Sequence, residues 1–280
     1  MTSIQRNNLK SPVQGLLIYN TTDNQINYFT GINWHSAGVI PLASKGFTTE
    51  WETTIAGESI TLPLNNGNGS GFNCTVDWGD GTTSTITSAT DPDRIHPYTL
   101  AGSYTIEITG KCEGWSFNNT GSRLNITAVS DWGDPCLFNG FKYLSEGFYG
   151  CNNLSSLPSG GILASDIGCV NFSSTFRGCS GLTGTIPEDI FKHHTSAASN
   201  AFLQTFRDCN SLTTLPEDLF KYNTLVSSNG FFRTFYGCSS LSTTIPSDLF
   251  RHNTLASSYS FYQTFYNCNN LTGNICVVFK

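Results

Sequence analysis

Charged side chains are scarce in this chain, and no part of it is strongly basic or strongly apolar. Asp, Glu, Lys and Arg make up 12% of the 280 residues, and the formal net charge is −6. Proteins that hold nucleic acid through its phosphates usually carry a basic cluster, so we expect no nucleic-acid partner. No apolar run reaches the ~18 residues of a membrane-spanning helix, so we also expect no membrane insertion.

Recognisable catalytic and cofactor motifs are also missing. The sequence contains no HExxH, GxSxG, Walker loop or CxxC pair, and the glycine-rich segment 67–71 (GNGSG) precedes no helix signal. We therefore expect no enzymatic activity, no cofactor and no metal site. The opening residues, MTSIQRNNLKSPVQG, lack the apolar segment of a secretory signal, which favours a protein that works without host secretion or a mature form.

Neutral polar residues take the place of charge. Ser, Thr and Asn account for 92 of the 280 residues, and there are 27 Gly and 20 Phe. This composition favours short strands and turns over long charged helices. We expect a mainly β protein.

The first 46 residues predict a β-hairpin. Residues 15–20 (GLLIYN) and 26–29 (INYF) are strand-like and flank a polar turn. An isolated hairpin is only marginally stable, so this one must pack on another copy, another protein or the rest of the chain. The pattern YNTT, then Tyr28-Phe29-x-Gly31 and Trp34, resembles hairpin modules of phage tail-fibre and virion proteins. That resemblance implies docking to other virion proteins and homo-oligomer formation; the alternative is a hairpin that caps the next domain.

Residues 47–113 predict an antiparallel β-sandwich, because apolar residues alternate in several short segments separated by turns. Three pieces, WGDG at 78–81, HPY at 96–98 and GSYTI at 102–106, resemble the PKD-type immunoglobulin-like domain. The resemblance implies a sandwich without catalytic residues. Asp77 and Asp80 favour turn formation, with calcium binding as the alternative. Cys74 and Cys112 are either two buried thiols or a disulfide.

The second half of the sequence repeats itself. Five blocks, GFYGCNNL, TFRGCSGL, TFRDCNSL, TFYGCSSL and TFYNCNNL, place their cysteines 28, 30, 29 and 30 residues apart. Three copies continue as IPEDIFKHHT, LPEDLFKYNT and IPSDLFRHNT. Such a period predicts a solenoid in which single repeats do not fold alone.

Within one repeat, Leu212 and Leu215 predict a short strand, and Pro216 predicts the first turn of a helix that ends near Lys221. Phe231 and Phe235 lie four residues apart, so we expect both rings on one face and in the core. The five aligned cysteines would lie about 4.8 Å apart with parallel side chains, which favours buried thiols over disulfides.

The layout F-x-x-T-F-x-x-C-x-x-L-T followed by Pro resembles leucine-rich repeats of the BspA type, found in bacterial surface proteins and some phage proteins. GWSFNN at 114–119 and DWGDP at 131–135 resemble the linker between a PKD-like domain and such repeats. The resemblance implies a linker or cap at 114–146 and a leucine-rich-repeat solenoid with short helical turns at 147–280.

The repeats also supply candidate binding residues. Hydroxyls that recur at the predicted strand suit a neutral glycan or a protein loop on a host cell, although they could serve solubility alone. These candidates are Thr183, Thr213, Thr214, Ser242, Thr243 and Thr272. Three further residues recur at one repeat position as stacking platforms or as the rim of the core, namely Tyr149, Tyr236 and Tyr266.

Together these features predict a non-enzymatic surface protein. The favoured function is a phage virion or tail-fibre component, on the virion surface, that presents its repeats for host attachment. The alternatives are a secreted adhesin on the bacterial cell surface and a purely structural capsid or tail decoration.

Overall fold

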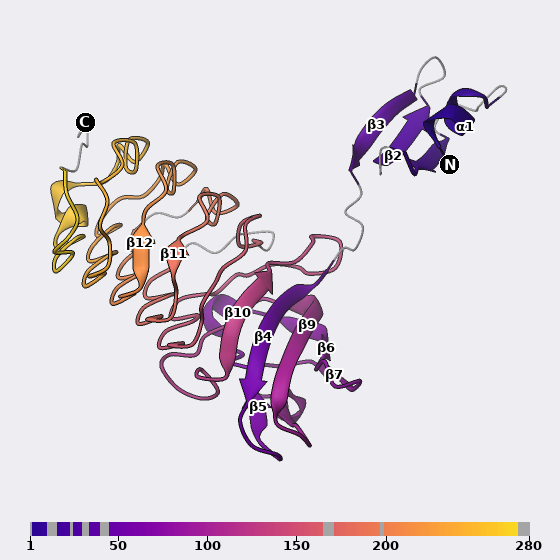
Figure 1. The fold of residues 1–280 in the computed structure, drawn as a ribbon, viewed down its shortest axis with the longest axis horizontal. Helices are drawn as coiled ribbons and strands as arrows, with labels where there is room; N and C mark the ends of the chain where they lie inside the picture. Colours follow the sequence, from indigo (N-terminus) through magenta and orange to yellow (C-terminus); the bar gives the residue numbers. More distant parts are fainter. Residues whose placement is uncertain are drawn as a thin grey trace. The chain divides into compact units, whose positions relative to one another are not determined.

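A computed structural model describes residues 2–9, 16–22, 25–29, 34–39, 45–164, 171–196 and 199–273 (Figure 1). The chain divides into two compact units, Met1–Ser44 and Lys45–Lys280. The N-terminal unit contains α1 (Ser3–Asn7), β1 (Leu17–Asn20), β2 (Gln25–Phe29) and β3 (Trp34–Val39). The C-terminal unit contains β4 (Phe47–Thr53), β5 (Ser59–Thr61), η1 (Gly67–Gly69), β6 (Phe72–Asp77), β7 (Thr83–Ile86), η2 (Pro92–Arg94), β8 (Ile95–Pro97), β9 (Gly102–Cys112), β10 (Ile126–Asp131), β11 (Gly184–Thr185), β12 (Leu212–Thr214) and η3 (Ser258–Phe261).

The N-terminal unit is built on a three-stranded antiparallel sheet in the order β1-β2-β3. The predicted hairpin is confirmed as β1 and β2, whereas β3 was not predicted; Gly31 of the hairpin motif lies outside the described residues. Asn20 and Asn27 are buried in this sheet. The side-chain amide nitrogen of Asn20 donates to the side-chain oxygen of Asn27 at 3.1 Å. This small unit thus places polar groups, and not only apolar ones, in its interior.

The C-terminal unit opens with a five-stranded antiparallel sheet in the order β10-β4-β9-β6-β7, and β5 pairs separately with β8. The expected alternation is present, because Cys74 and Val76 of β6 are buried while Thr75 between them is exposed. The mainly β class with antiparallel strands is therefore confirmed. Strand β10 comes from the segment 114–146 that we expected to be a linker, and it forms one edge of this sheet.

The carboxylates of Asp77 and Asp80 hold a turn at the WGDG segment. Asp77 accepts a hydrogen bond from the Gly79 amide at 2.9 Å, and Asp80 accepts one from the Thr82 amide at 3.0 Å. Asp80 also lies 2.8 Å from His96 Nε2, and the His96 ring stacks on Trp78. These contacts are the turn chemistry that the sequence favoured.

The leucine-rich-repeat solenoid with short helical turns, predicted for residues 147–280, is wrong. In the described part of this region the strands are only β11 and β12, of two and three residues, and the one helix is the 3-10 turn η3. The Asn223 side-chain amide donates instead to the backbone carbonyls of Phe191 and His194 in the preceding repeat. Asp218 and Lys221, expected to complement a helix dipole, instead form an ion pair of 2.9 Å across a single turn.

The repeats form a stack of turns joined by backbone hydrogen bonds. The backbone amide of Phe148 donates to the Thr175 carbonyl, that of Phe176 to Thr205 and that of Phe206 to Thr234, so each of these repeats bonds to the next. Figure 1 shows the successive turns side by side. The stack continues from the sheet, because the Ser155 amide donates to the Thr127 carbonyl of β10 at 2.8 Å. We call residues 144–273 the repeat stack.

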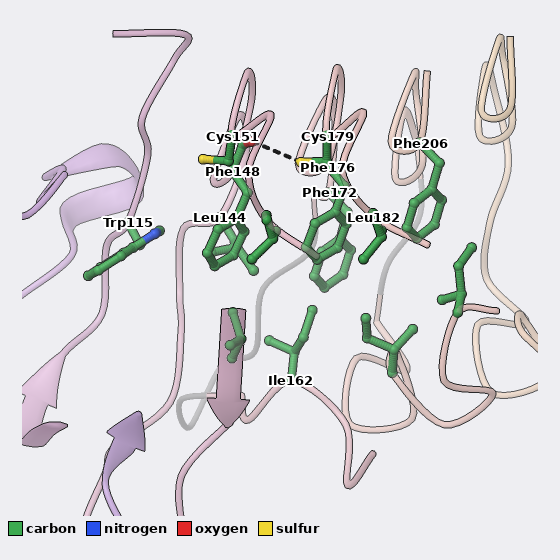
Figure 2. Packing of buried hydrophobic residues seen from close by; sticks show 14 of the residues in the cluster. Trp115, Leu144, Phe148, Cys151, Ile162, Phe172, Phe176, Cys179, Leu182 and Phe206 are labelled. Carbon is green, nitrogen blue, oxygen red and sulfur yellow. Dashed lines mark hydrogen bonds between the residues drawn. The ribbon is translucent and has the colours of Figure 1, made fainter. Parts of the chain in front are cut away.

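A column of phenylalanine rings fills the interior of the repeat stack. Successive rings lie 5.3 to 5.6 Å apart and nearly parallel, as Figure 2 shows for the first three; they are Phe148, Phe176, Phe206, Phe235 and Phe265. A second column contains Phe202 and Phe231, which are 5.7 Å apart. The prediction that Phe231 and Phe235 share the core is confirmed, since neither ring is exposed.

The four-residue spacing of these rings arises without a helix. Asn200, Gln204 and Asp208 have φ values of 56°, 55° and 61°, so every fourth residue is left-handed. A left-handed residue ends each right-handed turn and returns the next side chain to the same face. Spacing that is typical of an α-helix is thereby produced by consecutive turns.

The five aligned cysteines are buried and free, as the sequence favoured. The last four thiols each donate to a phenylalanine carbonyl of the preceding repeat; Cys179 reaches Phe148 at 3.1 Å (Figure 2) and Cys238 reaches Phe206 at 3.0 Å. Burial raises the pKa values of the Cys179 and Cys238 thiols well above the ordinary value of a cysteine. It raises the pKa of the Cys268 thiol to about 11. These thiols are therefore protonated donors at neutral pH.

Candidate binding surfaces

The six predicted hydroxyl residues are brought together by the structure. They follow one another along one side of the repeat stack: the Ser242 amide donates to Thr213 at 3.3 Å, and the Thr272 amide donates to Thr243 at 3.2 Å. Thr183, Thr213, Ser242 and Thr272 are exposed, whereas Thr214 and Thr243 are half-buried. We call this set, Thr183, Thr213, Thr214, Ser242, Thr243 and Thr272, the hydroxyl row.

Hydroxyls along this side hold neighbouring repeats together. The Thr213 hydroxyl donates to the Gly184 carbonyl at 3.2 Å, and the hydroxyls of Thr244 and Thr272 lie 3.3 Å apart. Ser155 makes the same kind of bond to Thr127 at 2.9 Å. These hydrogen bonds between repeats are sufficient to explain why hydroxyl residues recur at this position. Contact of the hydroxyl row with a ligand stays a prediction.

The recurring tyrosines stack on their neighbours. The Arg177 guanidinium lies 4.8 Å from the centre of the Tyr149 ring, and that of Arg207 lies 4.7 Å from the Tyr236 ring. Tyr236 also stacks on Tyr266 at 5.1 Å. The arginines and adjacent rings thus occupy the tyrosine faces, which favours the rim interpretation over open stacking platforms.

A groove of about 400 Å³ crosses the repeat stack and was not predicted. Its lining includes asparagine and glutamine amides and aromatic rings, chiefly those of Asn171, Asn200, Gln204, Asn229, Phe232 and Tyr259. We call it the amide–aromatic groove.

Two equivalent positions of the repeat build this groove. One lies two residues before the first buried phenylalanine and holds Asn200, Asn229 and Tyr259; the next position after that phenylalanine holds Leu203 and Phe232. Aligning the repeats on their buried phenylalanines would have revealed these polar and aromatic residues. These residues occur once per repeat and lie outside the cysteine blocks that mark the repeats.

A second groove, of about 510 Å³, lies beside the sheet and includes Glu52, Glu58 and Arg123 in its lining. The Thr54 amide and the Asn125 side chain both donate to Glu58 and lower the pKa of its carboxyl despite partial burial. Arg123 donates to the carbonyls of Asn119 and Gly150. The polar groups of this groove are thus engaged in holding the sheet to the first repeat.

Among the residues that the structure describes, no cluster of three or more His, Cys, Asp or Glu side chains is arranged to bind a metal ion. In the same residues no helix has the length and hydropathy of a membrane span.

Comparison with known proteins gives one positive result. No curated protein and no solved structure matches this chain. Neither the PKD-type nor the BspA-type resemblance gains support. Residues 1–54, which include the N-terminal sheet and β4, match the family described as a phage tail like trimerisation region.

Proposed function

We propose that the chain is a homotrimeric structural component of a phage tail, in which the N-terminal region joins three copies and the C-terminal unit contacts the host surface. The match of residues 1–54 to a phage tail-like trimerisation region carries this proposal. It supports trimer formation and virion association and favours a tail component over a secreted bacterial adhesin.

The size and surface of the N-terminal unit agree with assembly. Domains of about 40 residues usually need oligomerisation, metals or disulfides for stability. Ile4 is 75% exposed and Tyr19 is 39% exposed in the single chain, so apolar surface is available for another copy. Burial of this surface in a trimer would stabilise the unit.

The C-terminal unit has the properties of a rigid display module. Its repeats are tied to one another by backbone, thiol and hydroxyl hydrogen bonds, and its ion pairs join neighbours within single turns. We propose a non-enzymatic role for this unit, because its repeated polar residues serve packing or lie on open surfaces. Three such modules on one trimer would give a multivalent contact with the host.

The trimer is tested with the full chain by native mass spectrometry. The parent should have three times the 30.5 kDa mass of one copy. Ile4→Glu combined with Tyr19→Glu should shift it toward the monomer, because two charges cannot be buried unpaired at an interface. Leu100→Glu, a matched change at a residue that is 68% exposed on the C-terminal unit, should leave the mass unchanged. A monomeric parent would refute the proposal.

Virion association is tested separately. The chain should be detected by mass spectrometry in purified particles of the phage that encodes it, and purified trimer added in excess should reduce phage adsorption to host cells. A chain that is absent from every particle preparation would contradict a tail role. A trimer that leaves adsorption unchanged would contradict host contact and leave only a structural role in the tail.

A further inference from the structure

We propose that the amide–aromatic groove binds a neutral carbohydrate chain, an inference that rests on the proposed host contact and gives it a ligand class. The groove combines the two kinds of group that a sugar needs. Asparagine and glutamine amides each offer donors and an acceptor, which match vicinal hydroxyls. Aromatic rings offer apolar faces for the C–H side of a pyranose.

Two amides of the groove are available for a ligand. The side chains of Asn200 and Asn229 make no hydrogen bond with any other residue in the described part of the chain. Asn200 is exposed and Asn229 is half-buried. Both have positive φ values, 56° and 54°, which fix the backbone that carries them. Unpaired amides on a rigid backbone cost little entropy when they bind a ligand.

The aromatic end of the groove is preorganised as well. Phe232 stacks on Tyr262 at 5.4 Å and lies 5.8 Å from Tyr259, whose side chain is 59% exposed. The Arg233 guanidinium covers the Phe232 ring at 5.0 Å and donates to Gln263 at 2.7 Å. Tyr259 is therefore the ring with the most open surface for a sugar.

The groove favours a neutral saccharide over a peptide or an anion. None of its lining residues carries a charge. An extended peptide would need unpaired backbone groups to add a strand, but the amides of Asn200, Leu203 and Gln204 already donate to Ser228, Asn200 and Phe232. Equivalent rings of neighbouring repeats lie 5.3 to 5.7 Å apart, which is close to the length of one sugar ring. A periodic polymer of neutral sugars fits that step.

The test uses the full-length protein on an array of neutral bacterial and plant-type oligosaccharides, with acidic oligosaccharides included, followed by calorimetric titration of the best binder. We expect binding to at least one neutral oligosaccharide. Tyr259→Ala and Asn200→Asp should each weaken it about tenfold or more, the scale of a lost ring contact or a lost amide donor. Aspartate tolerates the left-handed backbone, so the second variant keeps the fold.

Matched controls distinguish the groove from other surfaces. Tyr222→Ala and Asn267→Asp change an exposed tyrosine and an exposed left-handed asparagine outside the groove, and both should bind as the parent does. Thr213→Lys combined with Thr243→Lys should also retain binding. The inference is overturned if no neutral oligosaccharide binds, if only acidic ones or peptides bind, or if the hydroxyl-row variant loses binding while the groove variants keep it.

Native mass spectrometry of the same samples separates this inference from the proposed function. A trimer that binds no neutral oligosaccharide overturns the groove assignment alone. A monomer that binds one through Tyr259 and Asn200 overturns the trimer alone.

Discussion

Buried hydroxyl and thiol groups of the repeat stack donate hydrogen bonds to backbone carbonyls of the neighbouring repeat. The hydroxyl of Thr205 donates to the Phe172 carbonyl at 2.8 Å, and the thiol of Cys209 donates to the Phe176 carbonyl at 3.0 Å. A buried polar group without a partner would cost about 1 to 3 kcal/mol, so these bonds make the buried Thr and Cys positions tolerable. The sequence predicted buried thiols, but it gave no sign that they act as donors, because the acceptors are backbone carbonyls without a sequence signature.

We expect Phe235→Ala to lower the free energy of unfolding by about 3 to 5 kcal/mol. The ring is fully buried and lies between Phe206 at 5.6 Å and Phe265 at 5.4 Å, so its loss leaves a cavity in the column. Denaturant titration measures the change. Tyr222→Ala, at an exposed ring, should change it by only about 0.5 kcal/mol; equal effects of both variants would place Phe235 outside the core.

Thiol reactivity should follow burial. In the folded protein Cys136 is exposed, and hydrogen bonding with Asp134 raises the pKa of its thiol, so it should react slowly with a thiol reagent. The five aligned thiols of the repeats, Cys179 among them, should react only after unfolding. A denatured, non-reduced sample should therefore contain at least five reactive free thiols. Mass spectrometry of the labelled protein identifies each site. A sample in which every cysteine forms a disulfide would contradict the buried free thiols of the repeats.

The pH dependence of stability should include a contribution from Asp80. Burial raises the pKa of this carboxyl, but hydrogen bonds from Thr82 and His96 outweigh burial and hold it below its ordinary value. The stabilisation is therefore present above the pKa of the unfolded chain, about 4, and is lost as pH falls through the lower folded value. Asp80→Asn should flatten the stability profile in that acid range; a profile that matches the parent's would contradict this.

At the scale of elements, the sequence predicted strands better than it predicted the repeats. Alternation in β6 identified the buried face because a strand has only two faces. The sequence predicted a helix after Pro216, but it gave no warning of left-handed residues other than glycine, such as Gln204 and Arg233. Such residues are rare enough that helical spacing normally outweighs them.

One repeat offers a direct test of that backbone. Gly150, Gly178 and Gly237 occupy the position at which Asp208 stands, and their φ values of 78°, 70° and 74° resemble its 61°. Asp208→Val should be less stable than Asp208→Gly by about 1 to 3 kcal/mol, because a β-branched residue is strained there. Both variants lose the carboxylate beside Arg207, so their difference reports the backbone alone. Equal unfolding free energies would refute a left-handed position 208.

At the scale of the molecule, the sequence indicated the trimerisation region but not the amide–aromatic groove. The sequence of the first 46 residues indicated docking and oligomer formation through a short hairpin pattern, and the match of residues 1–54 agrees with it. The amide–aromatic groove was missed because its residues lie one per repeat and become neighbours only when the repeats stack. A site assembled from Asn200, Asn229 and Tyr259 has no local motif to find.

Removal of one whole repeat should preserve the fold. Deletion of residues 209–237 joins Asp208 to Cys238, so the Cys238 thiol should take over the bond that Cys209 makes to Phe176. Deletion of residues 209–223 removes only part of a repeat, so it breaks the phenylalanine columns and the hydrogen bonds between repeats. Circular dichroism and thermal unfolding should show a cooperative transition for the first deletion and its loss for the second; equal behaviour of the two would contradict in-register stacking.

The repeated hydrogen bonds also give the repeat stack an adjustable length. The described repeats bond to one another through equivalent backbone amides and carbonyls, so a duplicated or lost unit would alter length without creating a mismatched junction. Each event would lengthen or shorten the repeat stack, and the amide–aromatic groove with it, by one step. A lineage could therefore change the length of the repeat stack, and of the proposed binding groove, by unequal recombination alone, without a point mutation in the core.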